Sequence, residues 1–304
     1  MNRPDRSTAS GRAYLDLQRL ARTSGRSMQA LLPMFASERW LTRLAVSDHR
    51  NRFVLKGGVL LAALGNRRPT QDADLLARGI SNNHDTVIGY INEIASIDLH
   101  DGMTFDPTTT VATTIRDSDL YLGVRLSMDC ALASAKIKLK LDVNFGDPVT
   151  PGPMPISLPT LLDGPPVEIL GYPIVTVLAE KLSTAVQLGE ANTRIRDYAD
   201  LYTLTGGHPL DFQRAHDALL ATASHRRIAL RPLSDAIGQL ATTRAGDYRN
   251  FRARLAIDGS DLPRDFADVI TAVVAFADPL IQGPPQNAWN PATRRWSSSD
   301  PSPP

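Results

Sequence analysis

The sequence predicts an α+β protein with two lobes, a mixed α/β lobe over residues 1–165 and an all-helical lobe over residues 166–282. Two stretches in which apolar and polar residues alternate strictly indicate a sheet in the first lobe. Helical periodicity dominates after the Pro- and Gly-rich segment 146–166, which marks the boundary. Residues 283–304 are rich in Pro, Ser and Asn, and we expect them to form a disordered tail.

The composition of the chain excludes several classes of function. The chain has 304 residues and a net charge of +1, so a uniformly basic nucleic-acid-binding protein is excluded. Its single cysteine, Cys130, excludes a disulfide framework and a cysteine-based zinc site. No apolar run reaches the roughly 18 residues of a membrane span, and the polar N-terminus lacks the apolar core of a signal peptide. We therefore expect a cytoplasmic protein without a membrane partner.

In the first lobe, the expected elements alternate between helix and strand. Apolar stripes at helical spacing predict helices over 12–22, 27–46 and 84–96. Short apolar runs predict buried strands at 53–55 and 72–76, and Gly57-Gly58 turns the chain from the first of these into a helix over 59–64. Two alternating strands follow, 122–130 and 136–143, joined by a short connection that favours an antiparallel hairpin.

The second lobe shows only helical patterns. Expected helices cover 175–188, 196–205, 212–223, 233–240, 247–255 and 263–277. No internal repeat interrupts the series.

Two acidic residues on one predicted strand are the first candidate for chemistry. Asp72 and Asp74 are spaced i, i+2, so their carboxylates share one face of the strand. Adjacent carboxylates repel each other unless a cation lies between them, and hard oxygen ligands suit Mg²⁺. The N–H groups of Gly57 and Gly58, at a helix N-terminus, suit an anion such as a triphosphate. The alternative is a chance Asp-x-Asp on an exposed strand end.

Asp142 strengthens the metal interpretation. It lies on the polar side of the alternating strand 136–143, whose neighbours Leu141 and Val143 point to the core. A third carboxylate beside an Asp-x-Asp is the arrangement that holds two Mg²⁺ ions for an in-line phosphoryl or nucleotidyl displacement. The alternative is a solvated strand edge that carries ordinary charges.

Four short motifs follow one another in an order that has a counterpart in a known family. They are Lys56-Gly57-Gly58 with Arg68-Pro69-Thr70-Gln71-Asp72-Ala73-Asp74-Leu75, then Leu141-Asp142-Val143, then Leu178-Ala179-Glu180-Lys181-Leu182, and last Arg194-Ile195-Arg196-Asp197-Tyr198-Ala199-Asp200-Leu201. This pattern resembles the AbiEii/AbiGii-type nucleotidyltransferase toxins, which include the mycobacterial MenT toxins, in the DNA polymerase β-type nucleotidyltransferase superfamily. The resemblance covers roughly residues 50–205. Val59 departs from it, because the family usually has Thr or Ser after the Gly-Gly pair.

The resemblance implies a fold and a set of roles. The first lobe would be a polymerase β-type core, a mixed sheet with flanking helices. Residues implied in catalysis are Asp72, Asp74, Asp142, Lys181 and Asp197, of which the first three would bind Mg²⁺. Residues implied in nucleotide binding are Lys56, Gly57, Gly58, Arg68, Thr70, Lys181 and Arg196. Asp197 would hold Lys181 or an arginine in place, whereas Asp200 could simply offset the helix dipole.

Basic residues that could follow an RNA backbone form local groups. They are Lys136, Lys138 and Lys140 beside Asp142, and Arg226, Arg227, Arg231, Arg249 and Arg252 in the second lobe. Tyr248 and Phe251 could stack on bases. The alternative for each is a solvated helix face with its aromatic residues in the core.

The resemblance therefore implies a toxin of a toxin–antitoxin system, a Mg²⁺-dependent nucleotidyltransferase that moves NMP from an NTP to the 3′ end of tRNA. Translation and growth would stop. The expected partners are tRNA, an NTP and a cognate antitoxin, and the expected state is a monomer. Two alternatives stay open: transfer to protein hydroxyls or a small molecule, and a non-catalytic nucleotide- or RNA-binding module.

Overall fold

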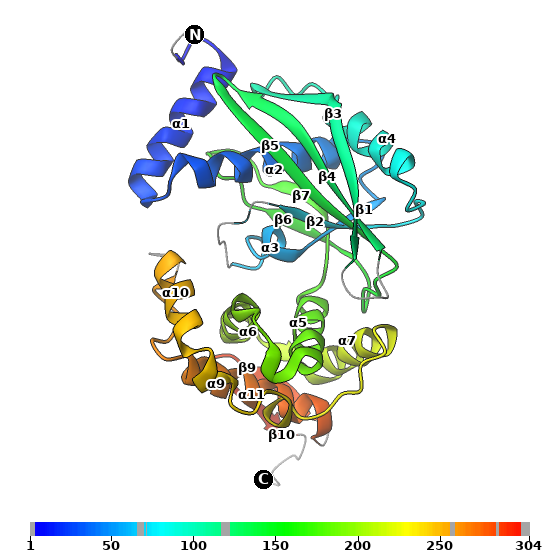
Figure 1. Cartoon of the computed structure of the whole chain (residues 1–304), viewed down its shortest axis with the longest axis vertical. Coiled ribbons are helices and arrows are strands. Elements are labelled where there is room, and N and C mark those ends of the chain that lie inside the picture. The colour runs from blue at the N-terminus through cyan, green and yellow to red at the C-terminus, as the bar shows by residue number, and fades with distance from the viewer. Residues whose placement is uncertain are drawn as a thin grey trace, which may run out of the picture. The chain divides into compact units, whose positions relative to one another are not determined.

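The chain folds into two compact units, shown in a computed structural model (Figure 1). The structure describes residues 4–65, 70, 72–116, 122–255, 259–283 and 286–298. The first unit takes in residues 1–63, 67–147 and 154–171, and the second takes in 64–66, 148–153 and 172–304.

A seven-stranded mixed sheet forms the centre of the first unit, with the strand order β3-β4-β5-β2-β1-β7-β6. Its strands are β1 (Phe53–Lys56), β2 (Ala73–Ala77), β3 (Met103–Arg116), β4 (Leu122–Leu132), β5 (Ala135–Phe145), β6 (Met154–Leu158) and β7 (Val167–Gly171). β2 runs parallel to β5, and β1 runs parallel to β7, while the remaining neighbours are antiparallel. The predicted mixed α and β character and the β4–β5 hairpin are confirmed.

Helices cover the sheet where the sequence places apolar stripes. They are α1 (Ala9–Ser24), α2 (Met28–Val46), α3 (Gly57–Leu60) and α4 (His84–Ala95). The side chains of Thr8 and Ser27 cap the first two by accepting backbone N–H groups of their first turns. In Figure 1, α2 packs against β5 and β7, and α4 against β3. The buried residues of α2, among them Phe35 and Trp40, form the core on this side.

Three strands of the first unit were not expected. β3 is an edge strand in which Pro107 and a register shift between Asp106 and Val111 break the alternation. β6 and β7 flank or interrupt the Pro- and Gly-rich segment whose composition indicates a loop. The helix expected over 59–64 is the single turn α3, which begins at Gly57.

The second unit is mainly helical. Its helices are α5 (Ile174–Leu188), the 3₁₀ turn η1 (Gly189–Ala191), α6 (Ile195–Gly207), α7 (Phe212–His225), α8 (Leu233–Ile237), α9 (Leu240–Thr243), α10 (Ala245–Leu255) and α11 (Phe266–Gln282). α5 packs on α7, and α6 packs on α11. Among the helices of the described residues, none has both the length and the apolar character that crossing a membrane requires.

The second unit also contains a small sheet, so it is not wholly helical. β8 (Leu210–Asp211), β9 (Gln286–Asn290) and β10 (Arg295–Ser298) form it. The prediction of a disordered tail is wrong for residues 286–298, because two tryptophans anchor them. The Trp289 side chain is fully buried and its Nε1 donates to the Thr205 carbonyl at 2.7 Å. The Trp296 indole donates to the carbonyl of Phe276 and stacks on its ring.

Candidate active site

A row of four charged residues crosses the sheet of the first unit. In β2, Asp74 lies directly opposite Lys56 of β1 on one side and Asp142 of β5 on the other. Asp142 in turn lies opposite Arg125 of β4. Residues directly opposite each other in neighbouring strands project from the same face of a sheet. Lys56, Asp74, Asp142 and Arg125 therefore form one line on that face, here named the charged row.

The Gly57-Gly58 turn packs closely against the Asp74 carboxylate. Gly57 has a φ of +64°, and a Cβ at this position would overlap the Asp74 carboxylate. Only glycine meets both requirements without strain. The backbone N–H of Gly58 donates to the Asp74 carboxylate. This N–H was expected to be free for an anion, and α3 is too short to add a substantial helix dipole.

Asp74 has a strongly perturbed acidity. The pKa of Asp74 is raised to about 6: burial raises it most, the nearby Lys56 ammonium opposes the rise, and the carboxylates of Asp142 and Asp72 add to it. The neighbouring carboxylates disfavour the charged form of Asp74 because like charges repel. A bound cation would reverse this effect, because it favours the ionised carboxylate.

Asp72 lies just before β2, and one of its carboxylate oxygens is available to coordinate a cation. Its Oδ1 is buried and finds no hydrogen-bond partner among the residues that the structure describes. Buried acceptors are nearly always satisfied in folded proteins. The Thr70 hydroxyl donates to the backbone carbonyl of Asp72 at 3.3 Å, which ties the two residues together ahead of the strand.

Asp142 is held by an arginine that the sequence analysis did not identify. Arg125 Nε and one terminal guanidinium nitrogen donate to the two carboxylate oxygens of Asp142 at 2.8 and 2.6 Å. Such bidentate pairs are among the strongest hydrogen-bonded ion pairs in proteins. The hydrogen bonds and charge of Asp142, with smaller contributions from Asp72 and Asp74, raise the pKa of Arg125. Arg125 therefore belongs electrostatically to the carboxylate group.

Lys56 also has an acidic partner that was not expected. Its ammonium forms an ion pair with Asp147 at 2.6 Å, and both side chains are over nine-tenths buried. Asp147 follows the end of β5, and 91 positions separate the two residues in the chain. Lys56 thus lies among carboxylates at the end of the charged row.

The donor set fits a hard divalent cation. Asp72, Asp74, Asp142 and Asp147 bring four carboxylates, against the two cations Lys56 and Arg125, which leaves an excess of two negative charges when all are ionised. Carboxylate oxygens are the ligands that Mg²⁺ prefers. Across the described part of the chain, no three His, Cys, Asp or Glu side chains are already arranged to hold a metal ion. Asp142, with both oxygens on Arg125, is turned toward the guanidinium.

The second unit holds a separate buried ion cluster. Lys181 of α5 donates to Asp197 at 2.7 Å and to Asp200 at 2.8 Å, both on α6. Arg194 pairs with the other oxygen of Asp197 at 2.9 Å. Because Asp197 and Asp200 are spaced i, i+3, they share the face of α6 that meets Lys181. Arg196 is exposed beside this cluster.

Opposite charges outweigh burial in this cluster. Burial by itself lowers the pKa of Lys181, but Asp200 and Asp197 raise it above its ordinary value. Burial by itself raises the pKa of Asp197, but Lys181 and Arg194 lower it below its ordinary value. Lys181 and Asp197 are therefore charged at neutral pH, and the Lys181 ammonium is about as close to Asp200 as to Asp197.

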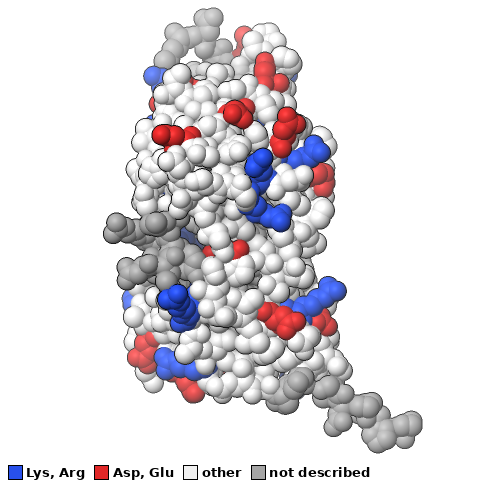
Figure 2. All heavy atoms as spheres, turned by 90° about the vertical axis from the view of Figure 1, so that its right-hand side faces the viewer, with Lys and Arg blue, Asp and Glu red and all other residues white. Residues whose placement is uncertain are grey.

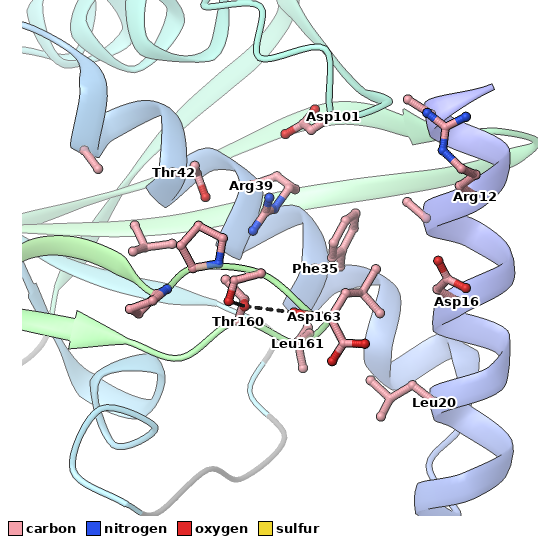
Figure 3. Close-up of a pocket in the computed structure, with 18 of the residues that line it drawn as sticks. Arg12, Asp16, Leu20, Phe35, Arg39, Thr42, Asp101, Thr160, Leu161 and Asp163 are labelled. Atoms are coloured by element: carbon pink, nitrogen blue, oxygen red, sulfur yellow. Dashed lines mark hydrogen bonds between the residues drawn. The ribbon is translucent and has the colours of Figure 1, made fainter.

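Two cavities among the described residues of the first unit lie away from the charged row. The larger one, about 780 Å³, lies among α1, α2 and the β6–β7 connection, with Arg39, Phe35 and Asp16 in its wall (Figure 3). It contains none of the four residues of the row. A second cavity of about 30 Å³, room for a water molecule, lies beside Gly58 and Thr70. Arg68, expected near the nucleotide, lies outside the described residues.

Some of the residues expected to contact RNA are engaged in contacts within the protein, and the others are exposed. Arg226 clamps α7 to α5 through the Glu180 carboxylate and the Thr184 hydroxyl. Arg252 donates to the carbonyl of Leu262, and the Tyr248 ring is buried against Phe266, so Tyr248 is not available to stack on a base. Exposed members are Lys136, Lys138, Arg227, Arg231 and Arg249, while Lys140 is half-buried. On the face shown in Figure 2, basic and acidic side chains are interspersed.

Comparison with solved structures identifies the fold. The fold is that of a nucleotidyltransferase: the structure resembles MenT4, a nucleotidyltransferase toxin from Mycobacterium tuberculosis, with a TM-score of 0.51 and 18% identity over 86% of this chain and 98% of that one. JHP933 from Helicobacter pylori is a more distant match, with a TM-score of 0.43 and 17% identity over 84% of this chain and 92% of that one. No curated protein sequence matches the chain.

Comparison with protein families gives the narrower assignment. Residues 39–272 match the nucleotidyl transferase AbiEii toxin family of type IV toxin–antitoxin systems. Since the match covers well over half of the chain, the protein belongs to this family. The resemblance drawn from the four motifs is thereby confirmed.

Proposed function

We propose that this protein is a Mg²⁺-dependent nucleotidyltransferase toxin that transfers NMP from an NTP to the 3′ end of tRNA. The observation that carries the proposal is the register of β2 and β5, which sets Asp74 directly beside Asp142 next to the buried, unsatisfied oxygen of Asp72. The family supplies nucleotidyl transfer, an NTP as substrate and an antitoxin as partner. The dependence on Mg²⁺ and the choice of tRNA as acceptor are the two parts of the proposal that go beyond the family assignment.

In the proposed reaction, the 3′ hydroxyl oxygen attacks the α-phosphorus and pyrophosphate leaves as the bridging P–O bond breaks. Asp142 orients the attacking hydroxyl and accepts its proton, a role that suits a carboxylate at hydrogen-bond distance. Bound Mg²⁺ would supply charge neutralisation at the phosphates, held by Asp72, Asp74 and Asp142. Lys181 is kept charged by Asp197 and Asp200, and its role toward the nucleotide phosphates stays a prediction from the sequence.

The exposed arginines favour RNA as the acceptor, while those engaged in packing weaken the case for the full basic set. Arg227, Arg231 and Arg249 remain candidates for phosphate contacts. Transfer to protein hydroxyls or to a small molecule is an outcome that the same experiment detects.

The test is incubation of the protein with Mg²⁺, each α-labelled NTP in turn, total tRNA and cell extract. Label in tRNA that is lost on 3′-end trimming supports the proposal, and label in protein or small molecules contradicts the acceptor. Asp74→Asn and Asp129→Asn form a matched pair, because both are aspartates of the same sheet but only Asp74 lies in the charged row. We expect transfer to fall at least about 100-fold in Asp74→Asn and to persist in Asp129→Asn.

A further inference from the structure

Arg125 occupies both oxygens of the Asp142 carboxylate, which a divalent cation would need as a ligand. Both oxygens of Asp142 accept hydrogen bonds from the guanidinium, at 2.8 and 2.6 Å. Asp142 is one of the three carboxylates that would hold the cation of the proposed function, so that cation and this guanidinium would share a carboxylate. Like charges at such short range repel strongly in a partly buried site. Arg125 and a divalent cation therefore compete for Asp142.

Arg125 is placed so that it can leave. Its side chain is 49% exposed, whereas that of Asp142 is 13% exposed. The arginine stays charged at every physiological pH, so deprotonation cannot release it. An anionic phosphate can, because a guanidinium binds phosphate oxygens with the same forked geometry that it uses on a carboxylate. The NTP of the proposed reaction supplies phosphates of this kind.

The strand register explains why Arg125 meets this carboxylate and not another one. Arg125 is directly opposite Asp142 in the β4–β5 ladder, which continues without a register shift from Val124 to Leu132. Four positions further along β4, Asp129 lies opposite Lys138, and that pair is exposed on both sides. The Arg125 pair differs from it because its carboxylate belongs to the charged row.

We propose that Arg125 caps Asp142 in the nucleotide-free protein, weakens divalent-cation binding, and moves to the substrate phosphates when the nucleotide enters. Arg125 is then a positioning residue that acts on the metal site through Asp142. The inference rests on the proposed function for the identity of the site. It adds that the site resists cations until the nucleotide arrives.

The test is the affinity for Mn²⁺ in the absence of nucleotide, measured by electron paramagnetic resonance on the full chain. We expect Arg125→Gln to bind Mn²⁺ roughly 10-fold or more tightly than the wild-type protein, because a positive charge and a competitor are removed. A purely structural role would weaken binding or leave it unchanged, and either result overturns the proposal. Thermal unfolding and far-UV circular dichroism verify that the variant is folded.

Two controls separate the cap from general charge effects. Arg52→Gln removes the same charge from the same unit, at an exposed arginine over the Tyr90 ring and outside the charged row. Equal tightening in Arg52→Gln overturns the proposal. In the Asp142→Asn background, Arg125→Gln should bring no further tightening, since the cap acts through that carboxylate. Tightening of the same size there also overturns it.

Failure of this inference is distinguishable from failure of the proposed function. The proposed function requires label transfer to tRNA with Mg²⁺, whereas the cap requires only the difference in Mn²⁺ affinity. Transfer with no tightening in Arg125→Gln rejects the cap and keeps the function. Tightening without transfer to any acceptor keeps the cap and rejects the function.

Discussion

At the scale of single residues, Asp74 lies among the candidate metal ligands, and its ionised form lowers the stability of the folded protein. Its raised pKa means that the folded state binds a proton more tightly than the unfolded chain does. Stability from this group is fully present below the ordinary aspartate pKa of 3.8, and it is lost as the pH rises through about 6. The charged Asp74 of the metal-free protein is therefore unfavourable at neutral pH.

Asp74→Asn tests this linkage. In buffer with a chelator at pH 7.5, we expect the variant to be more stable than the wild-type protein by about 1–3 kcal/mol, because the neutral amide avoids the unfavourable ionisation. At pH 4 the two proteins should be nearly equal. Urea unfolding at both pH values measures the difference. A variant less stable than wild type at pH 7.5 contradicts the burial argument.

The carboxylates of the site were predictable from sequence, and their partners were only partly so. The i, i+2 spacing of Asp72 and Asp74 and the alternation around Asp142 carry the prediction. Arg125 was within reach of the same reasoning, because the tight connection at Ala133-Ser134 pairs Leu132 with Ala135 and thereby fixes Arg125 opposite Asp142. Asp147 was not, since no local pattern links it to Lys56.

At the scale of elements, the contact between α5 and α6 depends on a buried cation. Lys181 neutralises Asp197 and Asp200, whose side chains are 8% and 2% exposed. Removing one partner of such a cluster leaves uncompensated buried charge. The motifs Leu178–Leu182 and Arg194–Leu201 therefore have a structural role in addition to any role toward the nucleotide.

Lys181→Met is expected to lower the free energy of unfolding by about 3 kcal/mol, since two buried carboxylates then face each other. Arg194→Gln should cost less than about 1 kcal/mol, because the Arg194 side chain is 41% exposed and Lys181 still pairs with Asp197. Urea denaturation of both variants gives the comparison. Similar losses in the two proteins would show that the cluster is not held by Lys181. A loss of activity in Lys181→Met is assigned to catalysis only at a temperature and urea concentration at which the variant is folded.

At the scale of the whole molecule, the net charge of +1 makes any nucleic-acid contact local. Two adjacent arginines show how different neighbours in the chain can be. Arg226 is half-buried in hydrogen bonds to Glu180 and Thr184, while Arg227 is exposed. Sequence alone gives both the same role, because it does not show which side of the helix end meets α5.

Arg226→Gln should lower the free energy of unfolding by about 1–2 kcal/mol, because its bonds to α5 are lost. Arg227→Gln should leave stability within about 0.5 kcal/mol. If Arg227 contacts tRNA, its removal also reduces the slope of log affinity against log salt by about 1. Fluorescence anisotropy with labelled tRNA across a salt series measures the slope. An unchanged slope removes Arg227 from the RNA contacts.

The C-terminal strands show why composition misled the prediction for this part of the chain. Pro, Ser and Asn dominate from Gly283 onward, yet Trp289 and Trp296 are spaced so that both reach Phe276. Two large aromatic side chains bury enough apolar surface to order a short hairpin that local propensity would not fold. The shared partner of these tryptophans is Phe276 of α11, 20 positions before Trp296 and outside the tail, so periodicity within the tail itself carries no signal.

Trp289→Ala is expected to destabilise the second unit by about 3–5 kcal/mol, because it leaves a large cavity beside Phe276 and Trp296 and removes the hydrogen bond to Thr205. Hydrogen–deuterium exchange locates the effect. Protection should fall in α7 and α11, which contact the tail strands, and in α6, whose Thr205 carbonyl accepts the hydrogen bond of Trp289, and it should be retained in β2 and β5 of the first unit. Uniform loss of protection throughout both units would mean that they unfold cooperatively. Unchanged protection in α11 would show that the tail strands do not stabilise this helix.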